Sequence, residues 1–151
     1  MKASNRKGKR KMLITILVIL GIILAVLAGT MLAFEPGRRE ALNLIIDRVD
    51  FKNLHDGTYV GEYKGKKDSL RNTTVQVTVE SGAVTEIKVI KGALANEKQT
   101  AEVRNGHSIN DLLNEVIVSQ SIQVDVISGA TISSKVHLKA VENALEQAAA
   151  K

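Results

Sequence analysis

The feature that most constrains this chain is an uncharged apolar run, Met12 to Phe34, close to its N-terminus. The run has 23 residues, and about 20 apolar residues are enough for a helix to cross the hydrocarbon core of a bilayer. Because lipid offers no hydrogen bonds to the backbone, a single short span must be helical. The sequence therefore predicts one transmembrane helix over residues 12–34.

Basic residues are concentrated before the apolar run. Six of the 21 Lys and Arg residues precede it without any acidic residue, and the remaining 15 nearly balance 16 acidic residues. The net charge of +5 therefore belongs to the tail, which argues against a nucleic-acid-binding surface on the folded part. By the positive-inside rule, residues 1–11 stay in the cytoplasm and everything after Phe34 is extracytoplasmic. We expect a single-pass protein of the cell membrane.

A cleaved signal peptide is the alternative interpretation of the same run. Such peptides have an apolar region of about 7–15 residues and end in small residues spaced A-x-A. The run here is longer, and Gly29 to Phe34 is a poor cleavage site, which favours an uncleaved anchor. Both interpretations export the rest of the chain.

Small residues are spaced four apart within the run, at Gly21, Ala25 and Gly29. This spacing puts them on one helix face, where a second membrane helix could pack closely as a partner. The ordinary glycine and alanine content of a short apolar helix explains the spacing equally well.

Several classes of function are disfavoured by the residues present. Cysteine is absent, which excludes disulfides, thiolate metal sites and cysteine nucleophiles. The three histidines have no ligand partners at a recognisable spacing, so we expect no metal site. Ser128 lacks the Gly-x-Ser-x-Gly frame of a serine hydrolase. We therefore expect a carrier rather than a catalyst with its own substrate pocket.

Residues 35–55 are predicted to form a linker. Glu35-Pro36-Gly37 is typical of a helix end, so we expect the membrane helix to stop there. A short amphipathic helix is then predicted over residues 38–50 from apolar residues at helical spacing, namely Leu42, Ile45, Ile46 and Val49.

Residues 56–151 are predicted to form one extracytoplasmic domain. Alternation of apolar and polar residues predicts a hairpin of residues 75–79 and 83–91 that turns at Ser81-Gly82, with an extended segment at residues 58–60 beside it. The same alternation predicts a further strand over residues 122–126.

Helical patterns complete this domain. Ser108 is predicted to cap a helix over residues 109–118, and an apolar stripe predicts a terminal helix over residues 136–148. Residues 92–107 show no period and are expected to be a loop, with room for a short helix. The predicted fold class is α+β, a small partly antiparallel sheet with helices packed on one face.

The segment Asp125 to Thr131 lies at a predicted junction with the terminal helix. The start of a helix presents unpaired N–H groups and the positive end of its dipole, which favour phosphate. Small residues at 128–130 allow a phosphate to approach the backbone, and Thr131 adds a hydroxyl. An ordinary capped turn explains the same residues, since Ser, Gly and Thr are common before helices.

Asp125-Val126-Ile127-Ser128-Gly129-Ala130-Thr131 resembles the flavinylation motif of the FMN-binding domain family, which includes subunits of sodium-pumping quinone reductases and related electron-transfer complexes. The resemblance covers roughly Asp56 to Ala148. It begins at Asp56-Gly57-Thr58-Tyr59-Val60-Gly61, continues through the valine-rich hairpin and ends with the motif and its helix.

The resemblance implies a covalently bound cofactor. A magnesium-dependent flavin transferase would take FMN from FAD and join its phosphate to the Thr131 hydroxyl as a phosphoester. Asp125, Ser128, Gly129 and Ala130 would be read by the transferase or line the phosphate. The protein would relay electrons between a membrane donor complex and an extracytoplasmic acceptor.

One departure from the family concerns the loop after the hairpin. Many relatives carry a loop there that contains histidine and glycine and at which the flavin ring is contacted, whereas residues 91–100 contain neither histidine nor proline. The alternative to a flavoprotein is a membrane-anchored scaffold or ligand-binding module of the same fold without flavin.

Overall fold

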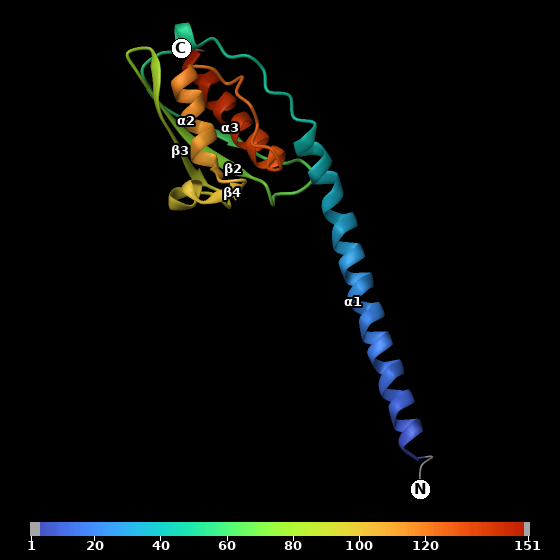
Figure 1. The fold of residues 1–151 in the computed structure, drawn as a ribbon. Coiled ribbons are helices and arrows are strands. Elements are labelled where there is room, and N and C mark those ends of the chain that lie inside the picture. Colours follow the sequence, from blue (N-terminus) through green and yellow to red (C-terminus); the bar gives the residue numbers. More distant parts are fainter. Residues whose placement is uncertain (1–3, 150–151) are drawn as a thin grey trace. The chain divides into compact units, whose positions relative to one another are not determined.

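The computed structural model describes residues 4–149, and the chain divides into two compact units between Pro36 and Gly37. The first unit is helical. The second contains a three-stranded sheet, a two-stranded sheet and the helices that follow them (Figure 1). The predicted α+β class is confirmed, with an antiparallel sheet, helices packed on it and an apolar helix before it.

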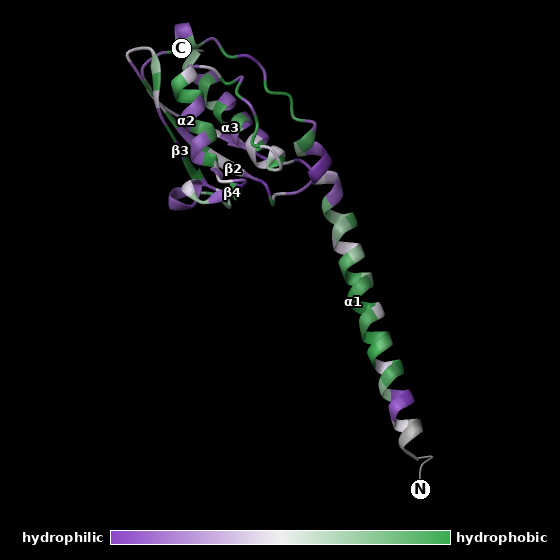
Figure 2. Ribbon diagram, in the orientation of Figure 1, coloured by the Kyte–Doolittle hydropathy of each residue, from purple (hydrophilic) through white to green (hydrophobic). Residues whose placement is uncertain are grey.

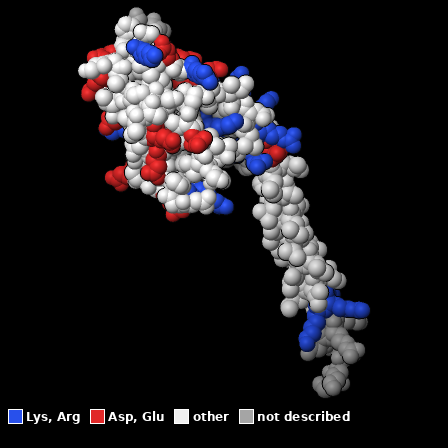
Figure 3. Space-filling view, turned by 45° about the horizontal axis from the view of Figure 1, so that its top comes forward, with Lys and Arg blue, Asp and Glu red and all other residues white. Residues whose placement is uncertain are grey.

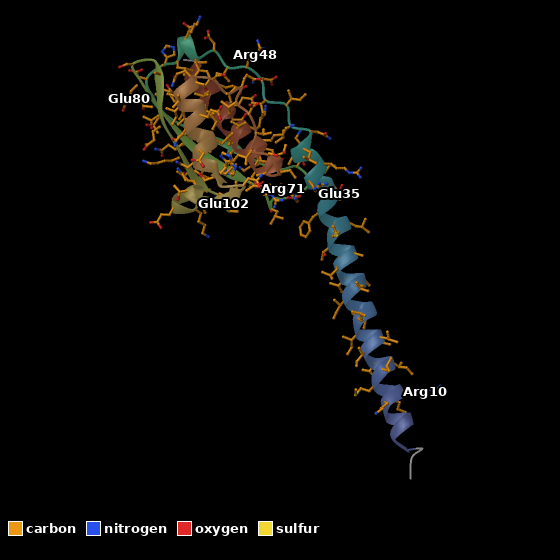
Figure 4. All side chains as sticks on the ribbon, in the orientation of Figure 1. Arg10, Glu35, Arg48, Arg71, Glu80 and Glu102 are labelled. Carbon is orange, nitrogen blue, oxygen red and sulfur yellow. The ribbon has the colours of Figure 1, made fainter. Side chains whose placement is uncertain are left out.

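Helix α1 runs from Ser4 to Leu42 and contains the whole apolar run. Its stretch Gly8–Leu42 is long and apolar enough to cross a membrane, and its most apolar window is entirely unburied. Figure 2 shows a continuous hydrophobic segment in the middle of α1 with hydrophilic turns on either side of it, and Figure 4 shows side chains that project on every side of the helix. Figure 3 shows Lys and Arg near its N-terminal end, followed by an uncharged surface. These features support a single-pass membrane protein.

The prediction that Glu35-Pro36-Gly37 ends the membrane helix is wrong, because α1 continues through Pro36 to Leu42. Proline lacks an N–H, so Pro36 removes one backbone hydrogen bond and destabilises the helix at this point. Contacts made by the turn after Pro36 must offset this loss. The last turn of α1 belongs to the second compact unit. It therefore contacts residues that are distant in sequence, which the local pattern around Pro36 does not reveal.

Those contacts hold the last turn of α1 to the domain. The Glu40 carboxylate accepts hydrogen bonds from the backbone N–H groups of Lys66 and Lys67, at 2.8 and 2.9 Å. These bonds lower the pKa of the Glu40 carboxyl, and the bond from Lys66 has the larger effect. Ala41 is completely buried in the core of the domain. Tertiary contacts therefore override the local signal for a helix end.

An irregular segment, residues 43–50, follows α1, so the predicted helix over residues 38–50 is wrong beyond Leu42. Some of its apolar side chains each contact the core separately, whereas Ile45 is 74% exposed. The partly buried ones are Leu44, Ile46 and Val49. Their spacing therefore reflects separate contacts from an extended chain and not one helical face.

The main sheet consists of β1 (Gly57–Tyr63), β2 (Thr73–Glu80) and β3 (Ala83–Lys91), in that order and antiparallel. The predicted hairpin and the strand beside it are confirmed. Gly82 closes the hairpin with a φ of +75°, a value that favours glycine. Alternate residues point inward and are buried, among them Val75, Val77 and Val79.

Helices α2 (Ile109–Ser119) and α3 (Thr131–Ala149) cover the inward face of this sheet (Figure 1). The predicted cap of α2 is confirmed: the Ser108 hydroxyl accepts from the N–H of Asp111, and the Asp111 carboxylate accepts from the N–H of Ser108 at 2.7 Å. The predicted stripe on the terminal helix is also confirmed, since all its members are buried, namely Val136, Ala140, Val141, Ala144, Leu145 and Ala148.

Helix α3 approaches β1 unusually closely at Gly61. A Cβ atom on Gly61 would overlap the carbonyl oxygen of Ala140 and lie 2.8 Å from the Cβ of Ala144. Because both partners belong to the helix backbone or its first side-chain atom, no flexible group can move aside. Glycine at position 61 therefore sets the distance between helix and sheet.

Side-chain amides bond the backbone of both outer strands. On β1, two carbonyls accept from α3 at 2.8 Å: Gln147 donates to Val60 and Asn143 to Glu62. On β3, Gln120 bonds both the N–H and the carbonyl of Val84, at 2.9 and 2.8 Å. The N–H of Val89 also donates to a side chain, that of Gln99, at 2.9 Å.

Two irregular parts of the domain differ from expectation. Residues 92–107 contain the 3-10 helix η2 (Asn96–Thr100) and an unpredicted hairpin of β4 (Glu102–Arg104) and β5 (His107–Ser108), whose strands are too short to show a period. The strand predicted over residues 122–126 is wrong, because that segment pairs with no strand among the described residues.

Candidate functional site

Residues Ile127 to Ala130 form a tight turn that leads into α3. The N–H of Ala130 donates to the carbonyl of Ile127 at 2.9 Å, and Gly129 has a φ of +79°, which glycine adopts at little cost. The fully buried Ser134 closes the turn from the helix, because its hydroxyl accepts from the N–H of Ile127 at 3.0 Å and donates to the carbonyl of Ala130 at 3.1 Å. The backbone before Thr131 is therefore well defined.

Thr131 is the first residue of α3 and is partly exposed. The first N–H groups of a helix have no acceptor within the helix, and the helix dipole is positive at this end. An anion at this position is therefore favoured. No carboxylate or imidazole bonds the Thr131 hydroxyl within the described part of the chain, so nothing there activates it as a nucleophile.

A cleft of about 260 Å³, here called the attachment cleft, opens at this helix start. One wall is Gly129 to Ser133, and the other is the last turn of α1 through Arg38 and Leu42. All of these residues belong to the second compact unit. The cleft thus presents a hydroxyl, a helix N-terminus and a guanidinium together.

The β4–β5 hairpin covers the outside of the motif. A Cβ atom on Gly129 would lie 3.0 Å from both Cγ and Nε of Arg104, so the arginine stem lies directly on the glycine. The neighbouring Asn105 side chain reaches the carbonyl of Ser128 at 3.4 Å. Any larger residue at position 129 would have to displace the Arg104 side chain, and the φ angle of Gly129 favours glycine as well.

The structure separates the predicted site residues. Gly129, Ala130 and Thr131 line the attachment cleft, whereas Asp125 and Ser128 line a different cleft of about 290 Å³. That second space is acidic, because it is also lined by Asp111 and Glu115, and like charges disfavour a phosphate there. Within residues 4–149, no cluster of His, Cys, Asp and Glu side chains could hold a metal ion.

A model of the FMN-binding domain family matches residues 70–146, just over half of the chain. The chain belongs to the FMN-binding domain family. The match begins after β1 and includes the motif and most of α3. Comparisons with curated protein sequences and with solved structures found no match.

The residues at the attachment cleft fit the phosphate end of FMN. Gly129 has no side chain and Ala130 has only a methyl group, so a phosphate can approach their backbone from the cleft, where the N-terminus of α3 and Arg38 supply positive potential. The cleft is smaller than the roughly 300–1,000 Å³ that enclose a whole drug-sized ligand.

A second cavity lies next to the attachment cleft, and Ile132 and Ser133 line both. Its volume is about 120 Å³, and it includes Leu94 from the loop after the hairpin and His137 from α3. The Nδ1 atom of His137 lies 2.6 Å from the carbonyl of Ser133, whereas Nε2 is buried without a partner. The FMN-binding domain of this chain therefore has a histidine near the motif, on α3 and not on the loop.

His137 should make stability depend on pH. Burial lowers its pKa from the ordinary value of 6.5, and the bond to Ser133 offsets this only partly. Below pH 6.5 the unfolded chain binds a proton more readily than the folded one, so the free energy of unfolding falls as the pH falls. Above pH 6.5 this contribution is complete. Thermal unfolding of the full chain in detergent between pH 5 and 8 measures the effect.

The variant His137→Asn tests the assignment, because its amide can still donate to Ser133 but does not titrate. It should flatten the pH dependence in this range, and the exposed control His55→Gln should leave it unchanged. An equal acid sensitivity in His137→Asn and the parent chain would show that another group is responsible.

Sequence reasoning missed the second wall of the attachment cleft and the cover over Gly129. Arg38 and Leu42 are far from the motif in sequence, and the expected helix end placed them in a separate linker. Arg104 lies in a segment without a period. The motif residues could be predicted from the sequence as a candidate site because their chemistry is local.

Proposed function

We propose that this chain is a membrane-anchored electron carrier in which FMN is bound covalently through its phosphate to the hydroxyl of Thr131. The observation that carries the proposal is the position of Thr131. In a member of the FMN-binding domain family, this hydroxyl lies at the start of α3 in a cleft suited to phosphate.

Attachment is a phosphoryl transfer from FAD. The Thr131 oxygen attacks the phosphorus of the FMN half, the bond to the bridging oxygen of the AMP half breaks, and AMP leaves. The threonine proton goes to a base of the transferase or to solvent, and no redox change occurs. Because the described residues give Thr131 no activating partner, a separate magnesium-dependent flavin transferase supplies the catalysis.

The chain's own residues fix the linkage. The bonds of Ser134 to Ile127 and Ala130 hold the turn, and the N–H groups at the start of α3 face the phosphate. Ser128 and Asp125, on the acidic side of the motif, are available for recognition by the transferase. Bound FMN supplies the electron transfer, while the protein positions it and sets its surroundings.

A covalent link suits the composition of this domain. The sequence has no tryptophan and only two tyrosines and two phenylalanines, and both tyrosines are buried in the core. Few aromatic faces are thus available to sandwich a flavin ring. A covalent bond holds FMN at a high local concentration, so strong noncovalent affinity for the flavin ring is not needed. It also prevents loss of the cofactor outside the cytoplasm.

The proposed arrangement has residues 1–11 in the cytoplasm, a transmembrane segment over residues 12–34, a connection over residues 35–55 and the FMN domain, residues 56–151, outside. The six basic residues before the apolar run support this orientation. Electrons pass from a membrane donor complex to the flavin and on to an extracytoplasmic acceptor.

Intact mass and in-gel fluorescence of the full chain test the proposal, after co-expression with a flavin transferase that modifies a known acceptor. The denatured protein should be fluorescent and heavier by FMN minus one water. A colourless protein of unmodified mass would reject the flavin carrier and leave an anchored binding module. Protease protection of an N-terminal tag in inside-out and right-side-out vesicles tests the orientation.

A further inference from the structure

The last turn of α1 provides one wall of the attachment cleft, although it precedes the family-matched region by about 30 residues. Arg38 and Leu42 lie one turn apart and line the cleft with Gly129 to Ser133. The family match covers residues 70–146, so this wall is outside the part of the chain that defines the family. Figure 1 shows the end of α1 beside the start of α3.

Two direct bonds from α3 fix this turn beside the motif. The Lys135 ammonium donates to the carbonyls of Leu42 and Leu44, at 2.6 and 3.1 Å. Lys135 lies one helical turn after Thr131, so it ties the end of α1 to the helix that starts the cleft. Carbonyls at the end of a helix attract cations, and Leu42 is the last residue of α1, so the lysine charge stabilises this helix end.

The loop between β1 and β2 fixes the other side of the same turn. The Glu40 carboxylate accepts from the N–H groups of Lys66 and Lys67. Gly37 is buried, and a Cβ atom there would overlap the Asp68 carboxylate. The backbone that carries Arg38 is therefore held from two directions, which limits where its side chain can reach.

We propose that Arg38 is a positioning residue for the flavin linkage, donating hydrogen bonds to the phosphodiester on Thr131. A phosphodiester keeps one negative charge. An arginine fork bonds two phosphate oxygens at once, and the bond is strengthened by both charges. The inference rests on the proposed function, and it makes the end of the membrane helix part of the cofactor site.

Other cations near the motif fit this role less well. Lys135 is not among the residues that line the attachment cleft. Arg104 lies on Gly129 from the hairpin side and does not line the attachment cleft. Arg39 is next to Arg38 and also exposed, but it does not line the cleft, so it is a matched control for charge and position.

The test compares Arg38→Gln, Arg38→Lys and Arg39→Gln in the full chain, in membranes supplied with transferase and FAD. The first measurement is the initial rate of FMN incorporation by in-gel fluorescence and intact mass. We expect Arg38→Gln to be about tenfold slower, as for a lost charge-assisted hydrogen bond. Arg38→Lys should recover part of the rate, and Arg39→Gln should stay within about twofold of the parent chain.

The second measurement separates a phosphate contact from a contact with the transferase. Each variant is purified with and without FMN, and the rise in Tm on loading is compared. A phosphate contact persists in the product, so Arg38→Gln should gain less than Arg39→Gln, while the unloaded proteins melt alike. Slow loading with a full rise in Tm would overturn the proposal, because Arg38 would then serve only the transferase.

The remaining outcomes are also decisive. If Arg38→Gln and Arg39→Gln agree in both measurements while the parent chain loads normally, Arg38 does not hold the phosphate and the proposed function is unaffected. If the parent chain itself never loads with an active transferase, the proposed function fails and this inference fails with it.

Discussion

Replacing Thr131 with alanine is expected to remove covalent FMN from the protein completely. The substitution deletes the oxygen that forms the phosphoester, and the other hydroxyls of the motif are placed differently. Ser134 is fully buried and bonds the turn, while Ser128 lines the acidic cleft. Co-expression with transferase followed by intact mass and fluorescence of the denatured chain should show only unmodified protein.

Three matched variants sharpen this expectation. Thr131→Ser keeps a hydroxyl and should still be modified, at a lower rate because its side chain is less restricted. Ser133→Ala removes the hydroxyl nearest in sequence within the attachment cleft and should keep the full mass of bound FMN. Flavin on Thr131→Ala that disappears in the double variant with Ser133→Ala would move the attachment site to Ser133.

Replacing Gly61 with alanine is expected to lower the free energy of unfolding by about 3 kcal/mol or more. The added Cβ would overlap the carbonyl of Ala140 on α3. Because that carbonyl is part of the helix backbone, α3 must move away from β1, which opens gaps in the core on both sides. Urea unfolding of the full chain in detergent, followed by circular dichroism, measures the change.

Val60→Ala is the control for Gly61→Ala. Val60 is the preceding residue of the same strand, points to the other face of the sheet and is 48% exposed. Its truncation should cost less than about 1 kcal/mol. Equal unfolding midpoints for Gly61→Ala and the parent chain would mean that α3 does not approach β1 this closely.

Patterns set by local chemistry were read correctly from the sequence. Alternating valines predicted the β2–β3 hairpin, Ser108 and Asp111 predicted the start of α2, and the apolar stripe predicted α3. Each depends on residues within one or two turns of one another, so the pattern and its structural cause coincide.

Elements that depend on distant contacts were predicted wrongly from the sequence. Residues 122–126 alternate like a strand, yet they pair with no strand among the described residues. The helix end expected at Pro36 is overridden by contacts of Glu40 with a loop 26 and 27 residues away. Arg38 is likewise far from the motif in sequence, so the wall of the attachment cleft that Arg38 and Leu42 form could be recognised only from the structure.

The amide side chains that bond β1 and β3 affect how neighbouring membrane-anchored copies of the chain can contact one another. Anchored copies share one plane and collide far more often than they would in free solution, and an open strand edge invites a neighbouring chain to extend the sheet. Asn143, Gln147, Gln120 and Gln99 already bond backbone groups that such a neighbour would need. These bonds disfavour extension of the sheet by a neighbouring copy at the backbone groups that they occupy.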